Sequence, residues 1–339
     1  MRYGGRISSI AFITGALLLA AACNDGSERP ASSASEIVEV SVTCGQALAM
    51  LPREYAMRSG IDRDHGLELV CAHAETGPEI AAALISGEVV VAEMVPAILY
   101  TVLEQGVDMV AFLPVLDREM GDLIVRADFP LPNADDGWEG VMRDLQGARI
   151  GVVVRGGAAE DLARGLFIAA DLDPDGPTYI ATGLSTTLAA LDAAEVDAAI
   201  AIEPGITVAV EENIAIQPFS LRDLTGPPFM DWAGLMYVAT RDYAEQNTEI
   251  LERFSRMWRE ALDWLKAPGD RTDAIELTGD FLDLEPSVAE VMFDRNRPYW
   301  ADSLRVEPAR FDAVGDFYHD IGRFQKAYHV ADYGFDVDE

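Results

Sequence analysis

Two similar segments of the chain constrain its fold more than any other feature of the sequence. The first begins at Thr76 and ends at Pro96, and the second begins at Thr182 and ends at Pro204. In each, a Thr-Gly pair opens an Ala-rich stretch, a turn follows, and an apolar run leads to a Glu and a Pro. Helices and strands alternating at this spacing predict parallel α/β sheets, and two copies predict two α/β lobes. Chance similarity between two Ala-rich α/β segments is the alternative to a true repeat.

The composition is strongly acidic. The chain has 339 residues, half of them hydrophobic, which is enough for two domains of ordinary size. Its 58 Asp and Glu outnumber its 25 Lys and Arg, and the net charge of −33 is spread along the chain. This charge argues against nucleic acid and anionic membrane surfaces as partners. It indicates a solvated acidic surface and says nothing about a ligand.

The N-terminus predicts export. Arg2 and Arg6 precede an apolar run over residues 10–22, which is too short to span a bilayer comfortably. The run ends in small residues before Cys23 and resembles the lipobox of bacterial lipoproteins, in which the Cys is acylated and becomes the mature N-terminus. A lipobox usually has Leu three residues before the Cys, where this chain has Ala20, so ordinary signal-peptide cleavage is the alternative. We expect lipidation at Cys23 and a lipid anchor in the membrane.

The remaining parts follow from composition and periodicity. Residues 24–36 have no apolar side chain larger than Pro and predict a flexible tether. Residues 129–140, rich in Pro, Gly and Asp, and residues 226–228 predict two crossings between the lobes. Helical spacing dominates the last hundred residues and predicts a helical C-terminal portion. The expected order is a signal peptide (1–22), a lipidated Cys and tether (23–36), the first part of lobe 1 (37–128), lobe 2 with the crossings (129–230), and the second part of lobe 1 with the C-terminal helices (231–339).

Several short elements, in order, carry a family resemblance that extends from Val38 to about Tyr299. They are the alternating opening strand and residues 75–79, 86–89, 144–152, 194–198 and 203–204. In these the chain resembles the periplasmic solute-binding proteins of the SsuA/TauA/THI5-like (NMT1) group, which serve ABC importers. The resemblance implies an α/β, two-lobed periplasmic-binding-protein fold of type II, with the ligand cleft between the lobes. It also implies a monomer without cofactor or metal, whose partners are a small-molecule ligand and ABC permease subunits.

The resemblance also implies the site residues. They are Thr43, Cys44, Gln46, Thr76, Gly77, Glu93, Met94, Arg155, Gly156, Gly157, Ser185, Glu203 and Trp232. Thr76-Gly77 and Gly156-Gly157 are at predicted helix starts, where free N–H groups favour an anion or a carbonyl oxygen. Plain helix capping is the alternative for Thr76. Arg155 is expected to pair either with an anionic ligand or with a surface carboxylate, and Trp232 either stacks on a ligand or packs internally.

The sequence departs from the family pattern where the ligand is expected. Ala158 stands where a Ser or Thr is usual, and Glu93 stands in a loop that usually has small residues. Glu93 and Glu203 are predicted at equivalent strand ends facing one cleft. A carboxylate a few ångströms from a bound anion costs on the order of 1–4 kcal/mol. We therefore predict a small nitrogen-bearing ligand, neutral or cationic, rather than a sulfonate.

No catalytic motif accompanies these residues. The sequence has no GxSxG, HExxH, Walker or GxGxxG motif, and its four His are scattered. We therefore predict a binding protein and not an enzyme. The alternatives are a THI5-like enzyme of pyrimidine synthesis, whose Cys-rich run is absent here, and a lipoprotein sensor or scaffold on the same fold.

Two cysteines remain once Cys23 serves as the anchor. Cys44 and Cys71 each end a predicted strand, and these two strands are expected to be neighbours. An exported location permits oxidation, so we predict a disulfide between them. The alternative is a pair of buried free thiols, because neighbouring strands do not guarantee the required Cβ geometry.

Overall fold

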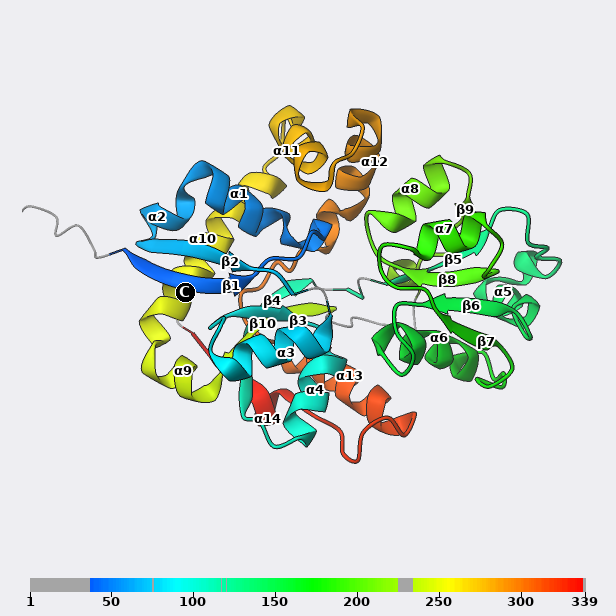
Figure 1. Cartoon of the computed structure of the whole chain (residues 1–339), viewed down its shortest axis with the longest axis horizontal. Helices are drawn as coiled ribbons and strands as arrows, with labels where there is room; N and C mark the ends of the chain where they lie inside the picture. Colours follow the sequence, from blue (N-terminus) through cyan, green and yellow to red (C-terminus); the bar gives the residue numbers. More distant parts are fainter. Residues whose placement is uncertain (1–36, 75, 117, 120, 225–233, 338–339) are drawn as a thin grey trace, which may run out of the picture. The chain divides into compact units, whose positions relative to one another are not determined.

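The computed structural model describes residues 37–74, 76–116, 118–119, 121–224 and 234–337 (Figure 1). The predicted signal peptide, Cys23, the tether, the return crossing at 226–228 and Trp232 lie outside the described residues. No helix in the described ranges is long and apolar enough to cross a membrane. The chain from Glu36 to Glu339 forms one compact unit.

The first lobe, residues 37–116 and 234–337, contains two small sheets. Strand β1 pairs in parallel with β2, and a three-stranded sheet has the order β3-β10-β4, with β10 antiparallel to both neighbours. A bridge between Val42 and Val91 joins β1 to the segment that enters β3. The elements up to residue 116 are β1 (Val38–Thr43), η1 (Leu48–Met50), α1 (Leu51–Ser59), α2 (Ile61–Asp64), β2 (Leu67–Ala72), α3 (Gly77–Ser86), β3 (Ala92–Met94), α4 (Pro96–Glu104) and β4 (Met109–Leu116).

The second lobe, residues 121–224, contains a five-stranded sheet in the order β7-β6-β8-β5-β9. Strands β7, β6 and β8 are parallel, and β5 runs antiparallel to β8 and β9. The elements are β5 (Asp122–Arg126), η2 (Ala134–Asp136), α5 (Trp138–Asp144), β6 (Arg149–Val152), α6 (Ala158–Ala169), β7 (Thr178–Ala181), α7 (Thr187–Asp192), β8 (Ala198–Ala201), α8 (Gly205–Glu211), β9 (Ala215–Ile216) and η3 (Leu221–Asp223).

Strand β5 corrects the predicted boundary between the lobes. The sequence placed residues up to 128 in the first lobe and a crossing at 129–140. In the structure β5 pairs with β8 of the second-lobe sheet. The chain therefore leaves the first lobe after Leu116, where β4 ends, and is in the second lobe by Asp122, where β5 begins. Residues 129–140 include η2 and the start of α5, and Asn133 bonds back to Asp144 of α5 through its backbone N–H at 2.8 Å. These residues form a turn within the second lobe because their polar groups bond to α5.

The two repeated segments fold alike. In each, a helix ends in a left-handed residue, Gly87 with φ 75° and Ala194 with φ 55°. In each, the backbone N–H of a Val donates to a carbonyl six positions earlier, from Val89 to Ala83 and from Val196 to Ala190. The strands that follow are β3 and β8. Glu93 lies inside β3 whereas Glu203 lies beyond the end of β8, so the two carboxylates are not at equivalent positions, contrary to the prediction.

The C-terminal portion is mainly helical. Its amphipathic helix α10 buries its apolar face against α1 and the core of the first lobe. Helix α12 contacts α8 of the second lobe, and α13 contacts α4. The elements are β10 (Leu235–Thr240), α9 (Arg241–Gln246), α10 (Thr248–Lys266), α11 (Thr272–Leu282), α12 (Pro286–Asn296), η4 (Arg297–Tyr299), α13 (Pro308–Asp320) and α14 (Val330–Tyr333).

One apolar core runs across both lobes. It includes Tyr100 of α4, Leu162 of α6 and Phe317 of α13. A Cβ built on Gly165 of α6 would lie 2.3 Å from Cζ of Phe317. Helices α6 and α13 therefore pack more closely than a residue larger than Gly at position 165 would permit. The C-terminal helices therefore join the lobes as well as covering the first one.

Candidate ligand-binding site

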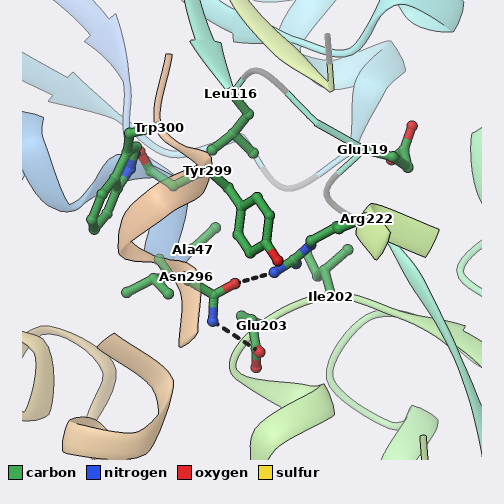
Figure 2. A pocket seen from close by; sticks show the side chains of 11 residues that line it. Ala47, Leu116, Glu119, Ile202, Glu203, Arg222, Asn296, Tyr299 and Trp300 are labelled. Carbon is green, nitrogen blue, oxygen red and sulfur yellow. Dashed lines mark hydrogen bonds between the residues drawn. The ribbon is translucent and has the colours of Figure 1, made fainter. Parts of the chain in front are cut away.

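A small pocket lies where the two lobes meet the C-terminal helices (Figure 2). Its cavity of about 30 Å³ is far smaller than the clefts of about 300–1,000 Å³ that hold drug-sized ligands, so a larger solute enters only when the walls part. The first lobe contributes η1, the end of β4, the end of α12 and the turn after it, and the second lobe contributes the residues after β8 and one residue of η3. The lining residues are Ala47, Leu48, Ala49, Leu116, Glu119, Ile202, Glu203, Arg222, Asn296, Tyr299 and Trp300.

Three polar side chains form one wall of this pocket. Arg222 donates from a terminal guanidinium nitrogen to Oδ1 of Asn296, and Nδ2 of Asn296 donates to Oε1 of Glu203 at 3.1 Å. The Tyr299 ring lies over the guanidinium, with 4.6 Å between Cζ of Arg222 and the ring centroid. Figure 2 shows the amide of Asn296 between the two charged groups. The wall therefore alternates cation, amide and anion.

Asp122 of β5 positions the segment that carries Arg222. Its carboxylate is fully buried and accepts hydrogen bonds from Oγ of Ser220 at 2.7 Å, from the N–H of Leu221 at 2.9 Å and from the amide of Gln217. Burial raises the pKa of Asp122, and these hydrogen bonds oppose the rise. A buried carboxylate in the sheet thus fixes the turn that directs Arg222 into the pocket.

Glu203 is held by its own helix. Its carboxylate accepts from the N–H and from Oγ1 of Thr207, both at 3.0 Å, at the start of α8. It is 6% exposed. A carboxylate at a helix N-terminus satisfies free N–H groups and suits the helix dipole. Glu203 is therefore both a cap of α8 and part of the pocket wall.

The second predicted carboxylate, Glu93, faces into the first lobe. It accepts from Oγ1 of Thr43 and from the N–H of Gly45 at 3.2 Å, and it lies 3.8 Å from the guanidinium of Arg53. Arg53 in turn donates to the carbonyls of Thr43 and Gly45, both at 3.1 Å. Met94 is 1% exposed in the core. This buried pair shapes the loop leading to η1 and does not line the pocket.

The predicted helix-start residues of the first lobe act as a cap. Thr76 and Glu79 form a capping box at the start of α3, in which the Thr76 N–H donates to the Glu79 carboxylate at 3.0 Å. A Cβ on Gly77 would lie 2.2 Å from Ile98 of α4, so this Gly is required for close helix packing. The capping alternative thus describes Thr76 in this structure.

The Arg155 loop of the second lobe is paired internally. Arg155 donates to Glu160 at 2.7 Å and to the carbonyl of Tyr179 at 3.0 Å, and the Gly156 N–H donates to Glu160 at 2.8 Å. Burial raises the pKa of Glu160, but the hydrogen bonds from Arg155 and Gly156 and the charge of Arg155 lower this pKa by more. The pKa of Glu160 is therefore below its usual range. Gly157 is the N-cap of α6. Arg155 therefore follows the alternative of pairing with a protein carboxylate.

The other predicted residues lie at the edges of the site. Gln46 is exposed next to Ala47 of the pocket, and Ser185 is exposed in the turn before α7. Among the predicted ligand residues that the structure describes, Glu203 alone lines the pocket. Arg222, Asn296 and Tyr299 were not predicted, because Arg222 and Tyr299 lie in short 3₁₀ turns, Asn296 ends α12, and none of these stretches carries a motif.

The structure joins Cys44 and Cys71 by a disulfide, with their Cα atoms 5.4 Å apart. The parallel register of β1 and β2 places Val42 opposite Cys71 and Thr43 opposite Ala72, so Cys44 follows directly at the strand end. The bond fixes the loop that leads to η1 and the pocket. Within the described ranges, no group of three or more His, Cys, Asp or Glu side chains is arranged to hold a metal ion.

Comparisons with solved structures define the class of fold. The alkanesulfonate-binding protein SsuA from Xanthomonas axonopodis pv. citri, bound to MOPS, is 17% identical with a TM-score of 0.73, and the match covers 90% of this chain and 100% of that one. The periplasmic aliphatic sulphonate binding protein SsuA from Escherichia coli is 17% identical with a TM-score of 0.68, covering 86% and 94%. The nitrate-binding protein NrtA from Synechocystis PCC 6803 is 11% identical with a TM-score of 0.62, covering 75% and 69%. The fold is that of the two-lobed periplasmic binding proteins.

The sequence itself identifies the family. Residues 33–279 match the model of the NMT1-like family, and this match covers most of the chain. The chain belongs to the NMT1-like family. No curated protein matches it closely enough to count as a relative.

Proposed function

We propose that this protein is an extracytoplasmic solute-binding protein that captures a small molecule between its lobes and delivers it to an ABC import permease. The observation that carries the proposal is the pocket at the junction of the lobes, lined by residues of both and by a polar wall that spans them. The alkanesulfonate-binding protein and the nitrate-binding protein that resemble this fold support a binding role for it.

The charges of the pocket favour a nitrogen-bearing ligand, neutral or cationic, over a sulfonate. The lining has two carboxylates, Glu119 and Glu203, and one guanidinium, Arg222. A sulfonate in this pocket would lie near the carboxylate of Glu203, at a cost on the order of 1–4 kcal/mol.

Membrane attachment is the second part of the proposal. Acylation of Cys23 followed by the polar tether of residues 24–36 would hold the binding unit outside the cytoplasmic membrane. Mass spectrometry of the mature N-terminus tests this step: a diacylated Cys23 is expected, and an unmodified start at Cys23 or Asn24 contradicts it.

The binding proposal is tested by a thermal-shift screen over sulfonates, pyrimidines, amines and carboxylates, followed by calorimetry. We expect a nitrogen-bearing solute to bind and Glu203→Gln to weaken it. Micromolar binding of taurine or an alkanesulfonate, unaffected by Glu203→Gln, contradicts the ligand class. Uptake that is unchanged when the gene is deleted contradicts transport and favours a sensor or scaffold. Turnover of a bound pyrimidine would favour the THI5-like enzyme.

A further inference from the structure

The amide of Asn296 lies between two buried charges that both belong to the second lobe. Its Oδ1 accepts from Arg222, and its Nδ2 donates to Glu203 at 3.1 Å and to the carbonyl of Met292 at 2.8 Å. The three side chains of the wall are 8%, 7% and 6% exposed for Arg222, Asn296 and Glu203. A buried guanidinium and a buried carboxylate are costly unless each is hydrogen-bonded. Asn296 supplies one bond to each.

Few chemical groups can serve both charges at once. A carboxamide presents an acceptor to the cation and a donor to the anion from adjacent atoms. A sulfonate or carboxylate presents acceptors only and would face Glu203 with like charge. An ammonium presents donors only and would face Arg222 with like charge. Arg222 and Glu203 are therefore complementary to a ligand group in which a C=O and an N–H are adjacent, with the C=O facing Arg222 and the N–H facing Glu203.

The size of the cavity links this pair to solute entry. A cavity of about 30 Å³ is small for a solute, so a solute must move its walls apart. Asn296 belongs to α12, whereas Arg222 and Glu203 follow the second-lobe sheet. When these walls part, the bonds of Asn296 break, and the second lobe presents a guanidinium and a carboxylate at amide spacing.

The side chains around the polar wall indicate the shape of the ligand. The Tyr299 ring lies over the guanidinium of Arg222, and Leu48, Leu116 and Ile202 line the neighbouring surface. Figure 2 shows Tyr299, Leu116 and Ile202 around the polar wall. An aromatic face and branched aliphatic side chains favour a small flat ligand with one polar edge.

We propose that the solute presents an amide-type edge, an adjacent C=O and N–H, to Arg222 and Glu203 and takes the place that the carboxamide of Asn296 occupies in this structure. The ligand class is a small neutral lactam, imide or ureide. The inference rests on the proposed function, since it assigns the substrate class of that same pocket. Asn296 then acts as an internal competitor that the solute displaces.

The first test uses the wild-type chain and two probes that differ by one methyl group. These are 2-pyrrolidinone, which has the C=O and N–H edge, and N-methyl-2-pyrrolidinone, which lacks the N–H. Such small probes bind at about millimolar strength, so ligand-observed NMR titration is the suitable measurement. We expect 2-pyrrolidinone to bind at least about tenfold more tightly, because N-methylation removes the ligand's donor to Glu203. Propanesulfonate is expected not to compete.

The second test removes the internal competitor. Asn296→Ala is expected to tighten 2-pyrrolidinone binding by about tenfold and N-methyl-2-pyrrolidinone binding by less, because only 2-pyrrolidinone also donates to Glu203. Asn247→Ala is the matched control, because Nδ2 of Asn247 also donates to a carbonyl four residues earlier, that of Tyr243 at 2.9 Å, but lies outside the pocket lining. The control is expected to bind like the wild type. The wild-type probe pair keeps the proposal testable if the Asn296 variant folds poorly.

Equal binding of the two pyrrolidinones, or tightening in Asn247→Ala as well, overturns the inference. If a solute from the wider screen binds while no amide probe competes with it, the binding function stands and the amide inference fails. If 2-pyrrolidinone binds selectively but deletion of the gene leaves uptake unchanged, the amide inference stands and the transport function fails.

Discussion

Arg323 and Asp161 join the C-terminal end of the chain to the first turn of α6. Nε of Arg323 donates to Oδ2 of Asp161 at 3.0 Å, and a terminal nitrogen donates to the carbonyl of Gly156, also at 3.0 Å. Arg323 follows α13, which contacts α4 of the first lobe, while α6 belongs to the second lobe. This ion pair is a second polar connection between the lobes, separate from Asn296 and the pocket.

Asp161 gives this connection a pH dependence. Its carboxyl is 5% exposed, and burial raises its pKa from 3.8 to about 6, although Arg323 opposes the rise and Glu160 adds to it. Between about pH 4 and 6 the folded state therefore holds more protons than the unfolded chain. The free energy of unfolding contributed by this group falls as pH rises through that window, by at most about 3 kcal/mol.

Urea unfolding of the wild type and Asp161→Asn at pH 4, 5, 6 and 7 measures this contribution. The variant has no titrating carboxyl at position 161. We therefore expect its free energy of unfolding to fall less with rising pH than that of the wild type. Asp175→Asn is the control, because Asp175 pairs with Arg164 of the same helix at 2.8 Å and is largely exposed. Parallel pH profiles for wild type and Asp161→Asn would show that Asp161 titrates normally.

The buried pair of Glu93 and Arg53 predicts a large loss of stability on truncation. Glu93→Ala leaves Arg53, which is 1% exposed, without its carboxylate, and breaking such a pair costs about 3–5 kcal/mol. Urea unfolding measures the loss. Glu54→Ala is the control, since Glu54 pairs with Arg58 at 2.6 Å on the same helix as Arg53 but at the surface, and its loss is expected below about 1 kcal/mol. Similar losses in both variants would argue against the buried pair.

The Cys44–Cys71 disulfide predicts a stability difference between oxidised and reduced protein. It closes a loop with a sequence separation of 27, and a loop of this length stabilises by about 3 kcal/mol. Unfolding with and without reductant measures the difference. Labelling of denatured, unreduced protein is expected to leave both thiols unmodified, and reaction of both would contradict the bond.

The contact between Gly165 and Phe317 predicts a pair of compensating substitutions. Gly165→Ala places a Cβ against the Phe317 ring in the core and is expected to cost about 1–3 kcal/mol. Phe317→Leu removes the ring, so adding it to Gly165→Ala should cost less than the sum of the two single losses. Thermal unfolding of the four proteins gives the coupling. Strict additivity would show that α6 and α13 do not meet there.

Residues close together in the sequence produced the predictions that the structure reproduces. The repeat around Gly87 and Ala194 predicted two α/β units because helix and strand periodicity, and the left-handed turn between them, depend on neighbouring residues. The amphipathic spacing of α10 predicted a core helix for the same reason. The pairing of Cys44 with Cys71 needed only the expectation that two consecutive strands are adjacent.

The partners of polar side chains could not be found in this way. The sequence identified Glu93 and Glu203 as notable carboxylates, yet Thr43, Gly45 and Thr207 take up their hydrogen bonds. A short polar side chain bonds to whichever group the packing places within about 3 Å, and the sequence does not encode that distance directly. Strand β5 was assigned to the wrong lobe for a related reason, since its sequence is equally suited to either sheet.

The sequence by itself determined the alternation of helices and strands, the helical C-terminal portion and the family, because these depend on local periodicity and on motifs in order. Only the tertiary structure decided which side chains form the pocket. Arg222 and Asn296 are 74 residues apart, and neither the turn of Arg222 nor the end of α12 carries a motif. They meet because α12 packs against α8, and that packing is set by apolar surfaces distributed over the whole chain.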